Sequence, residues 1–306
     1  MGGRRVGRFA AAALISLFLP LPAPAQDPVF RSQVNLVRLI VTVKDAHGGL
    51  VTDLASDDFS VYDNGVKQTV SVFERRTEQP LSVSLLIDTS GSTGIDLRQE
   101  VDSVLHFVTA LFKEGNPNDA ASLYSFDTDV TLHSSFTRRI PRLEHELQDL
   151  RSEAGTSMYD AIWLAARDLE GREGRHIVVI VTDGDDTTSS KDFKAALEAA
   201  QRSEVSVYPV VIVPISNPAG RNIGGEHALI TIAQYTGGRT FQPSNGAELE
   251  KAFADLVHEL RTQYMVGYYP KNIPPTDNRF HTTAVKLTRP GLRAIARTGY
   301  YGVADR

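Results

Sequence analysis

The chain of 306 residues contains no cysteine. This absence excludes disulfide bonds, thiol catalysis and zinc sites built from thiolates, and it also excludes a lipid anchor on an N-terminal cysteine. The formal net charge is -5, so the chain lacks the excess of basic residues with which proteins neutralise phosphate backbones. We therefore expect no nucleic-acid partner.

Motifs of several enzyme classes are also missing. The chain has no G-x-x-x-x-G-K-[ST] phosphate loop, and its eight histidines show no paired spacing of the zinc-enzyme type. Residues 90–94 lack the first glycine of a G-x-S-x-G nucleophile elbow. The D-T-S-G segment from Asp88 displaces the glycine of the aspartic-protease D-T-G and has no second copy. We expect neither an enzyme nor a small-molecule cofactor.

A single long apolar run stands at the N-terminus, over residues 9–19, after three arginines among the first eight residues. The run is too short to span a bilayer as a mature helix. Ala23–Ala25 forms an A-x-A cleavage signal before Gln26. The sequence predicts a signal peptide over residues 1–25 and an exported protein, periplasmic or secreted. An uncleaved anchor is the alternative.

Three regions of different periodicity follow. Residues 34–79 show strand-like alternation and an Asn-Gly hairpin turn within Asp63–Gly65. Residues 80–262 alternate apolar strands with amphipathic helices, which predicts an α/β domain with a doubly wound, mostly parallel, Rossmann-like sheet. Residues 263–303 return to a strand pattern. Because each β segment is too small to be stable alone, we expect the two to form one small β module.

Finer predictions follow from local patterns. Val66–Phe73 is expected to form a single strand, and Val205–Val213, which contains Pro209, is expected near a sheet edge or a bulge. Trp163 lies among apolar helical residues and is assigned to the core. The last four tyrosines are expected to pack the β module: Tyr268, Tyr269, Tyr300 and Tyr301.

Two apolar runs end in a carboxylate. Residues 83–87 stop at Asp88, and residues 177–182 stop at Asp183. Open α/β sheets place their binding sites at the carboxyl ends of the strands. Both carboxylates are therefore expected at one edge of the sheet.

Hydroxyl side chains accompany these carboxylates. Ser90 and Ser92 follow the first strand on a glycine-containing turn, and Thr156 lies in a loop before a helix. Together with the carboxylates they form an all-oxygen donor set, which suits a hard cation: Mg²⁺ first, with Mn²⁺ or Ca²⁺ as alternatives. The competing interpretation is that the hydroxyls only cap helices, but capping does not explain two carboxylates at strand ends.

The spaced pattern D-x-S-x-S, then a threonine, then T-D-G, resembles the metal-ion-dependent adhesion site of the von Willebrand factor type A family. The matching positions occur in the family's order: Asp88, Ser90, Ser92, Thr156 and Asp183. The resemblance covers roughly residues 80–262, and the layout with flanking β segments is similar to exported members in acidobacteria. It implies that these five residues hold the ion and leave one coordination position for an outside ligand.

The resemblance implies an exported, metal-dependent, adhesion-type module that engages a carboxylate on a protein partner. One alternative is a scaffold whose ion stabilises the loops. Another is a metal-assisted hydrolase, for which the sequence offers no positioned general base. The nearby Asp185 and Asp186 are interpreted as loop-solvating residues, and Asp160 as a helix-start carboxylate.

Overall fold

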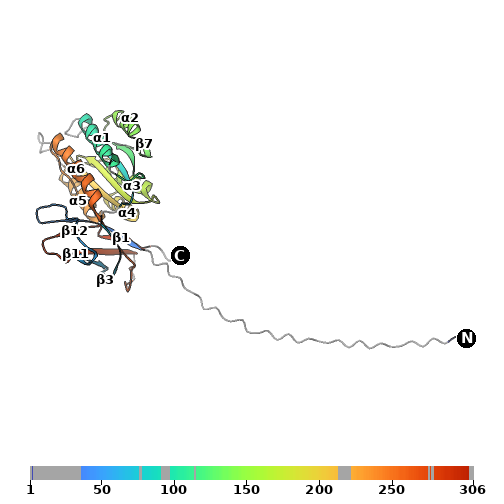
Figure 1. Cartoon of the computed structure of the whole chain (residues 1–306). Helices are drawn as coiled ribbons and strands as arrows, with labels where there is room; N and C mark the ends of the chain where they lie inside the picture. Colours follow the sequence, from blue (N-terminus) through green and yellow to red (C-terminus); the bar gives the residue numbers. More distant parts are fainter. Residues whose placement is uncertain are drawn as a thin grey trace. The chain divides into compact units, whose positions relative to one another are not determined.

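The computed structural model describes Gly2 and residues 36–75, 78–90, 97–113, 115–212, 222–274, 276 and 279–302 (Figure 1). Apart from Gly2, the predicted signal peptide lies outside these residues, and so does Ser92. Residues from Val34 to Arg306 belong to one compact unit. Within the described ranges, no helix has the length and apolar character needed to cross a membrane.

A five-stranded sheet forms the centre of the α/β domain, in the order β7-β6-β5-β8-β9. The strands are β5 (Leu81–Asp88), β6 (Ala120–Phe126), β7 (Val130–Thr137), β8 (Arg175–Thr182) and β9 (Val205–Val211). All pairs are parallel except β6 with β7. Every residue of β5 is buried, as expected for a strand covered on both faces. The predicted doubly wound fold class is confirmed, and the Pro209 strand lies at an edge.

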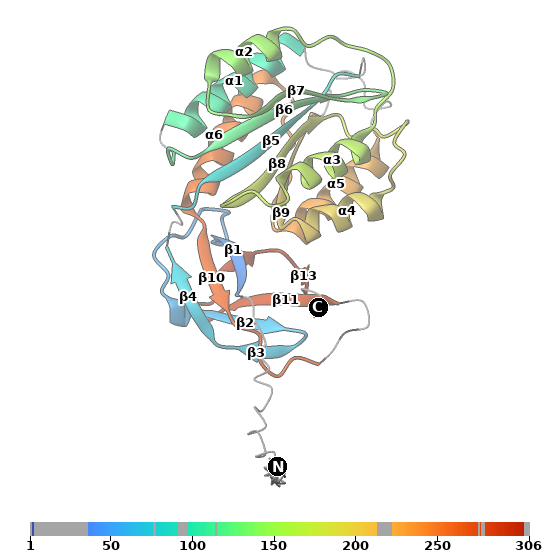
Figure 2. The same ribbon diagram turned by 90° about the vertical axis from the view of Figure 1, so that its right-hand side faces the viewer.

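Six helices cover this sheet in the described residues: α1 (Leu97–Lys113), α2 (Ile140–Gln148), α3 (Met158–Leu169), α4 (Phe193–Arg202), α5 (Ile223–Thr236) and α6 (Gly246–Thr262). Figure 2 shows α1, α2 and α6 on one face and α3, α4 and α5 on the other. Neighbouring β5 residues point to opposite faces, so Leu85 joins one apolar cluster and Leu86 the other. Two buried layers thus hold the strand ends in place.

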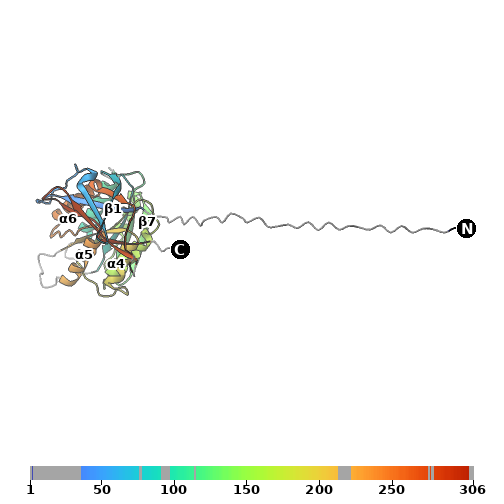
Figure 3. The same cartoon turned by 90° about the horizontal axis from the view of Figure 1, so that it is seen from below.

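The β module consists of two antiparallel sheets, β12-β1-β10-β4 and β13-β11-β2-β3. Its strands are β1 (Val37–Lys44), β2 (Phe59–Asp63), β3 (Val66–Gln68), β4 (Val70–Glu74), β10 (Tyr264–Tyr268), β11 (Phe280–Leu287), β12 (Arg293–Ile295) and β13 (Gly299–Tyr301). Pairing of β1 with β10 and of β2 with β11 joins the two ends of the chain. The blue and red strands lie together in the view from below (Figure 3).

Two details of the module differ from the sequence-based expectation. The single strand expected over Val66–Phe73 is divided into β3 and β4, because β3 pairs with β2 while β4 crosses to the other sheet and pairs with β10. The short strand β13 was not predicted. The expected hairpin turn is confirmed, since Asn64 and Gly65 have φ values of 46° and 80°, as a tight primed turn requires.

A buried carboxylate links strands of the module that are distant in sequence. Asp63 on β2 is fully buried, and its Oδ2 accepts hydrogen bonds of 2.8 Å from the hydroxyls of both Tyr268 and Tyr300. Its Oδ1 lies 3.1 Å from Nδ1 of His281. Tyr268 and Tyr300 therefore pack the module as expected, whereas Tyr269 is 43% exposed and does not.

Replacing Tyr268 with phenylalanine is expected to lower the free energy of unfolding by about 1–2 kcal/mol, because the buried carboxylate loses one of its donors. The adjacent Tyr269→Phe is the matched control and should change stability by less than about 0.5 kcal/mol, since that side chain is exposed. Urea unfolding followed by circular dichroism measures both. Equal transition midpoints for the two variants would contradict the assignment.

Trp163 is only partly buried, so its assignment to the core is wrong in part. One side packs against the apolar cluster beneath α3 and α4. Its ring also faces two cations, with Nζ of Lys191 at 4.9 Å and the guanidinium carbon of Arg167 at 5.8 Å. The helical periodicity located the apolar face but could not show that this position lies at its border.

Candidate metal centre

The two strand-end carboxylates lie at the same edge of the sheet. β5 and β8 are parallel neighbours, with Ile87 opposite Val181, so Asp88 ends one strand and Asp183 directly follows the adjacent one. Asp88 is fully buried, and Asp183 is partly buried. This placement is the one that the sequence predicted.

Two hydrogen bonds fix the carboxylate of Asp88. The hydroxyl of Thr182 donates to Oδ2 at 2.6 Å, and the backbone N–H of Ser90 donates to Oδ1 at 2.9 Å. Thr182 in turn accepts a hydrogen bond of 3.0 Å from the N–H of Gly184. The carboxylate is therefore held by both the loop after β5 and the end of β8.

Burial raises the pKa of the Asp88 carboxyl to about 6. Hydrogen bonds from Ser90 and Thr182 oppose this shift, and the neighbouring negative charge of Asp183 adds to it. Burial of the Asp88 carboxyl therefore disfavours its charged form in the absence of a cation. A bound dication would stabilise the ionised Asp88, so the electrostatics of the site fit a metal ion.

Thr156 lies at the same edge of the sheet, in a loop that is hydrogen-bonded to the segment after β8. Its carbonyl oxygen accepts the N–H groups of Thr187 at 2.8 Å and Thr188 at 3.1 Å. Its own N–H donates to the hydroxyl of Thr187 at 3.0 Å. The preceding Gly155 has φ +85°, and a Cβ there would lie 2.3 Å from Oγ1 of Thr128. Only glycine allows this backbone conformation and lets the loop lie so close to Thr128.

The loop after β5 adjoins the segment before Thr156. Ser90 is buried and forms an isolated parallel bridge with Glu153, whose N–H donates to the carbonyl of Thr89 at 3.0 Å. The four described candidates therefore belong to three mutually bonded segments at one sheet edge: Asp88, Ser90, Thr156 and Asp183. The fifth candidate, Ser92, lies outside the described residues.

Sequence reasoning missed the residues that support these donors. Thr182 orients Asp88, and Thr187 fixes the loop of Thr156. The role of Thr182 had a signal in the sequence, because this threonine of the T-D-G motif directly precedes the Asp183 carboxylate. Thr187 had no such signal, since its contact joins loops distant in sequence.

The neighbouring acidic residues have structural partners. Oδ1 of Asp186 accepts the N–H of Tyr159 at the start of α3, and Asp160 accepts the N–H groups of Ser190 and Lys191. The carboxylate of Asp185 accepts from the Asn222 side chain. These hydrogen bonds connect the loops that surround the candidate centre to one another and to the start of α3.

The donor chemistry restricts which ion would fit. Among the residues that the structure describes, no group of three or more His, Cys, Asp or Glu side chains could hold a metal ion. The candidate centre instead combines two carboxylates with hydroxyl oxygens. An ion with few protein carboxylates keeps several waters, as Mg²⁺ commonly does.

The domain is a doubly wound α/β fold, a class in which binding sites lie at the carboxyl edge of the sheet. Residues 83–185 match the family model described as the von Willebrand factor type A domain, and this range contains all five candidate donors. The match lies within the α/β domain, which is therefore similar to this family. No curated protein sequence is significantly similar to the chain.

Solved structures are similar to parts of this chain, and the first of the following three supports the fold. A von Willebrand factor type A protein from Catenulispora acidiphila has a TM-score of 0.51 and 10% identity, covering 90% of this chain and 76% of that chain. The von Willebrand factor domain of the type V pili tip protein Mfa5 from Porphyromonas gingivalis has a TM-score of 0.48 and 13% identity, covering 60% and 95%. The PilB minor pilin from Streptococcus sanguinis has a TM-score of 0.48 and 14% identity, and the match spans 61% of this chain and 62% of PilB.

Proposed function

We propose that the protein is an exported, adhesion-type module that binds a protein partner through a divalent cation, with Mg²⁺ as the first choice. The cation would be held by Asp88, Ser90, Ser92, Thr156 and Asp183. The observation that carries this proposal is the buried carboxylate of Asp88, held by two hydrogen bonds beside a second carboxylate. A buried carboxylate beside a second one favours a cation as its neighbour.

The donor set favours ligand binding by the ion. Two carboxylates balance the charge of a dication, while neutral hydroxyls leave the ion able to attract another anionic oxygen. A carboxylate on the partner, from an acidic side chain or a C-terminus, would then complete the coordination shell. The identity of the partner depends on the surrounding loops and not on the ion.

A purely loop-stabilising role for the ion has less support. Hydrogen bonds of Thr156 with Thr187 and Thr188 already join the loop before α3 to the loop after β8. An ion is therefore not required to hold these two loops together. The same contacts preorganise the centre for an outside ligand.

Export is part of the proposal and rests on the N-terminal pattern of arginines, apolar residues and an A-x-A signal. The mature chain is expected to begin at Gln26, which N-terminal sequencing of exported protein would establish. Retention of Met1 or Gly2 would instead indicate an anchor. Binding experiments should therefore use the exported form.

The test is capture of partners from envelope and secreted fractions by the immobilised mature protein, with Mg²⁺ or with a chelator. A partner should be retained with Mg²⁺, elute with the chelator, and return when Mg²⁺ is restored. Acetate at high concentration should compete, whereas acetamide, its neutral counterpart, should not. Retention that is unaffected by the chelator would contradict a metal-dependent mechanism, and substrate turnover would favour the hydrolase alternative.

A further inference from the structure

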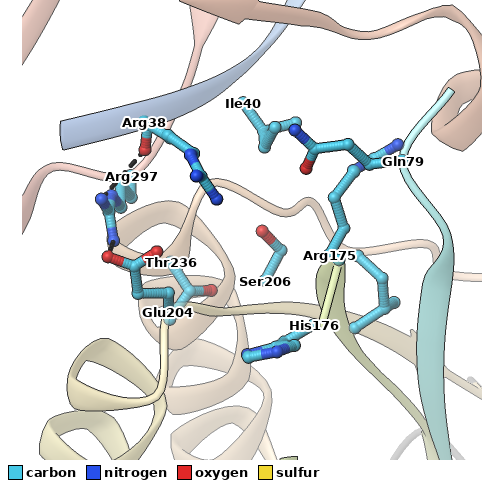
Figure 4. Close-up of a pocket in the computed structure, with 11 residues that line it drawn as sticks. Arg38, Ile40, Gln79, Arg175, His176, Glu204, Ser206, Thr236 and Arg297 are labelled. Atoms are coloured by element: carbon cyan, nitrogen blue, oxygen red, sulfur yellow. Dashed lines mark hydrogen bonds and ion pairs between the residues drawn. The ribbon is translucent and has the colours of Figure 1, made fainter. Parts of the chain in front are cut away.

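A cavity of about 60 Å³ lies where the β module meets the α/β domain (Figure 4). Arg175 and Ser206 contribute from the first residues of β8 and β9, and Arg38 contributes from β1. Asp183 follows the opposite end of β8, so the cavity and the candidate metal centre are separated by the length of that strand, roughly 25 Å. The cavity is therefore a distinct site.

Positive charge predominates around this cavity. Arg38, Arg175 and Arg297 line it, and the carboxylate there is that of Glu204. Glu204 is already paired with Arg297 at 3.1 Å, and Arg297 also donates to the carbonyl oxygen of Arg38 at 2.9 Å. Figure 4 shows the guanidinium of Arg38 pointing into the space between these elements. One carboxylate thus faces three guanidinium groups.

The most buried of these guanidinium groups is also incompletely paired. Arg175 is only 4% exposed, and its two hydrogen bonds go to neutral acceptors, the carbonyl of Leu260 at 2.7 Å and the side-chain oxygen of Gln263. Within the described part of the chain, its Nε has no hydrogen-bond partner. Burial lowers the pKa of Arg175 to about 10. Asp119 also acts on Arg175, but its carboxylate is paired with Arg261. A buried cation whose hydrogen bonds go only to neutral acceptors is unfavourable, and a bound anion would offset this cost.

The neighbouring histidine does not provide a free donor. Nδ1 of His176 lies 2.6 Å from the carbonyl of Ser203, and Nε2 lies 2.9 Å from the carbonyl of Arg172. Both ring nitrogens are engaged by the backbone. Recognition of a ligand therefore depends on the arginines.

We propose that this cavity binds a small free oxyanion of the phosphate or sulfate type, held by Arg38, Arg175 and Arg297. Guanidinium groups match the geometry of such oxygens with paired hydrogen bonds. The cavity has room for a few waters or one small anion.

The bound anion would join two parts of the chain. Arg38 and Arg297 belong to the β module, whereas Arg175 belongs to the central sheet. An anion that contacts both sides stabilises their association, because it binds the native state and not the unfolded chain. The bound anion would thus stabilise the contact between the β module and the α/β domain, independently of metal or partner binding.

The test is a calorimetric titration of inorganic phosphate into the full mature chain, with sodium chloride at the same ionic strength as the reference and sulfate as a second probe. Phosphate should bind saturably at one site and raise the melting temperature. Arg38→Gln should weaken phosphate binding by about tenfold or more, since it removes a charge-assisted contact. The Arg38 side chain is exposed on β1, so the variant should fold.

The matched control is Arg293→Gln, an exposed arginine of β12 that does not line the cavity. It removes the same charge from the same module and should leave phosphate affinity unchanged. The absence of saturable phosphate binding in the wild-type chain would overturn the proposal. Equal affinity in the wild type and both variants would overturn it as well, because the binding would then lie elsewhere.

Discussion

Asp183→Ala is expected to weaken Mg²⁺ binding by about a hundredfold or more while the protein stays folded. The substitution removes one of the two carboxylates that balance the dication. Asp183 is partly exposed at the end of β8, outside both apolar clusters, so its loss does not disturb the core. Ser90→Ala should weaken binding less, by about tenfold, because water can replace a neutral hydroxyl ligand more easily than a carboxylate.

The control for charge is Asp185→Asn, which removes a carboxylate two residues further along. The Asp185 carboxylate accepts from Asn222, and this substitution should change metal affinity only slightly. Calorimetric titration of Mg²⁺ and Mn²⁺ into all four proteins, with circular dichroism of each, measures affinity and folding together. Wild-type affinity in Asp183→Ala would refute the assignment of the centre. Loss of metal with undiminished partner binding would retain the centre and assign partner binding to another surface.

Deletion of residues 270–306 is expected to destabilise the N-terminal strands of the β module, above all the pair β2 and β3. The deletion removes β11, β12 and β13, so β2 and β3 remain as a two-stranded hairpin without their partner β11. An isolated hairpin is marginally stable in water at best. Asp63 would also lose its contacts with His281 and Tyr300. Of these three partners, only Tyr268 would remain.

Limited proteolysis provides the measurement. Cleavage within residues 36–75 should become at least about tenfold faster in the deletion variant, because proteases cut the opened population. The matched control is deletion of residues 303–306 alone, which keeps every described strand. Equal protection of residues 36–75 in both variants would show that the two β segments are stable independently.

Much of the α/β domain could be predicted because its signals are local. The run from Val83 to Ile87 is apolar at consecutive positions and is followed by a carboxylate, which is typical of a strand buried on both faces that ends at a site. The same reasoning applies to β8 and Asp183. Donor types and their order along the chain were sufficient to place both carboxylates at one edge.

The limits of prediction appear where a contact joins distant segments. Local alternation in Val66–Phe73 is the same whether the strand is continuous or divided, and only the partners β2 and β10 decide where it breaks. Likewise, the amphipathic pattern of α3 does not show how far its apolar face is covered at Trp163. Packing against other elements decides such positions.

The sequence by itself determined the strand-and-helix alternation, the Asn-Gly hairpin and the donor types at the strand ends, because periodicity and turn chemistry act over a few residues. Only the tertiary structure decided that Thr182 holds Asp88, that Asp63 links β2 with strands from the other end of the chain, and that three arginines meet around a cavity at the opposite sheet edge. The paired groups lie 94 residues apart in the first case and 205 in the second for Tyr268. No local pattern encodes such distances, since they arise when the sheet and the two β segments pack together.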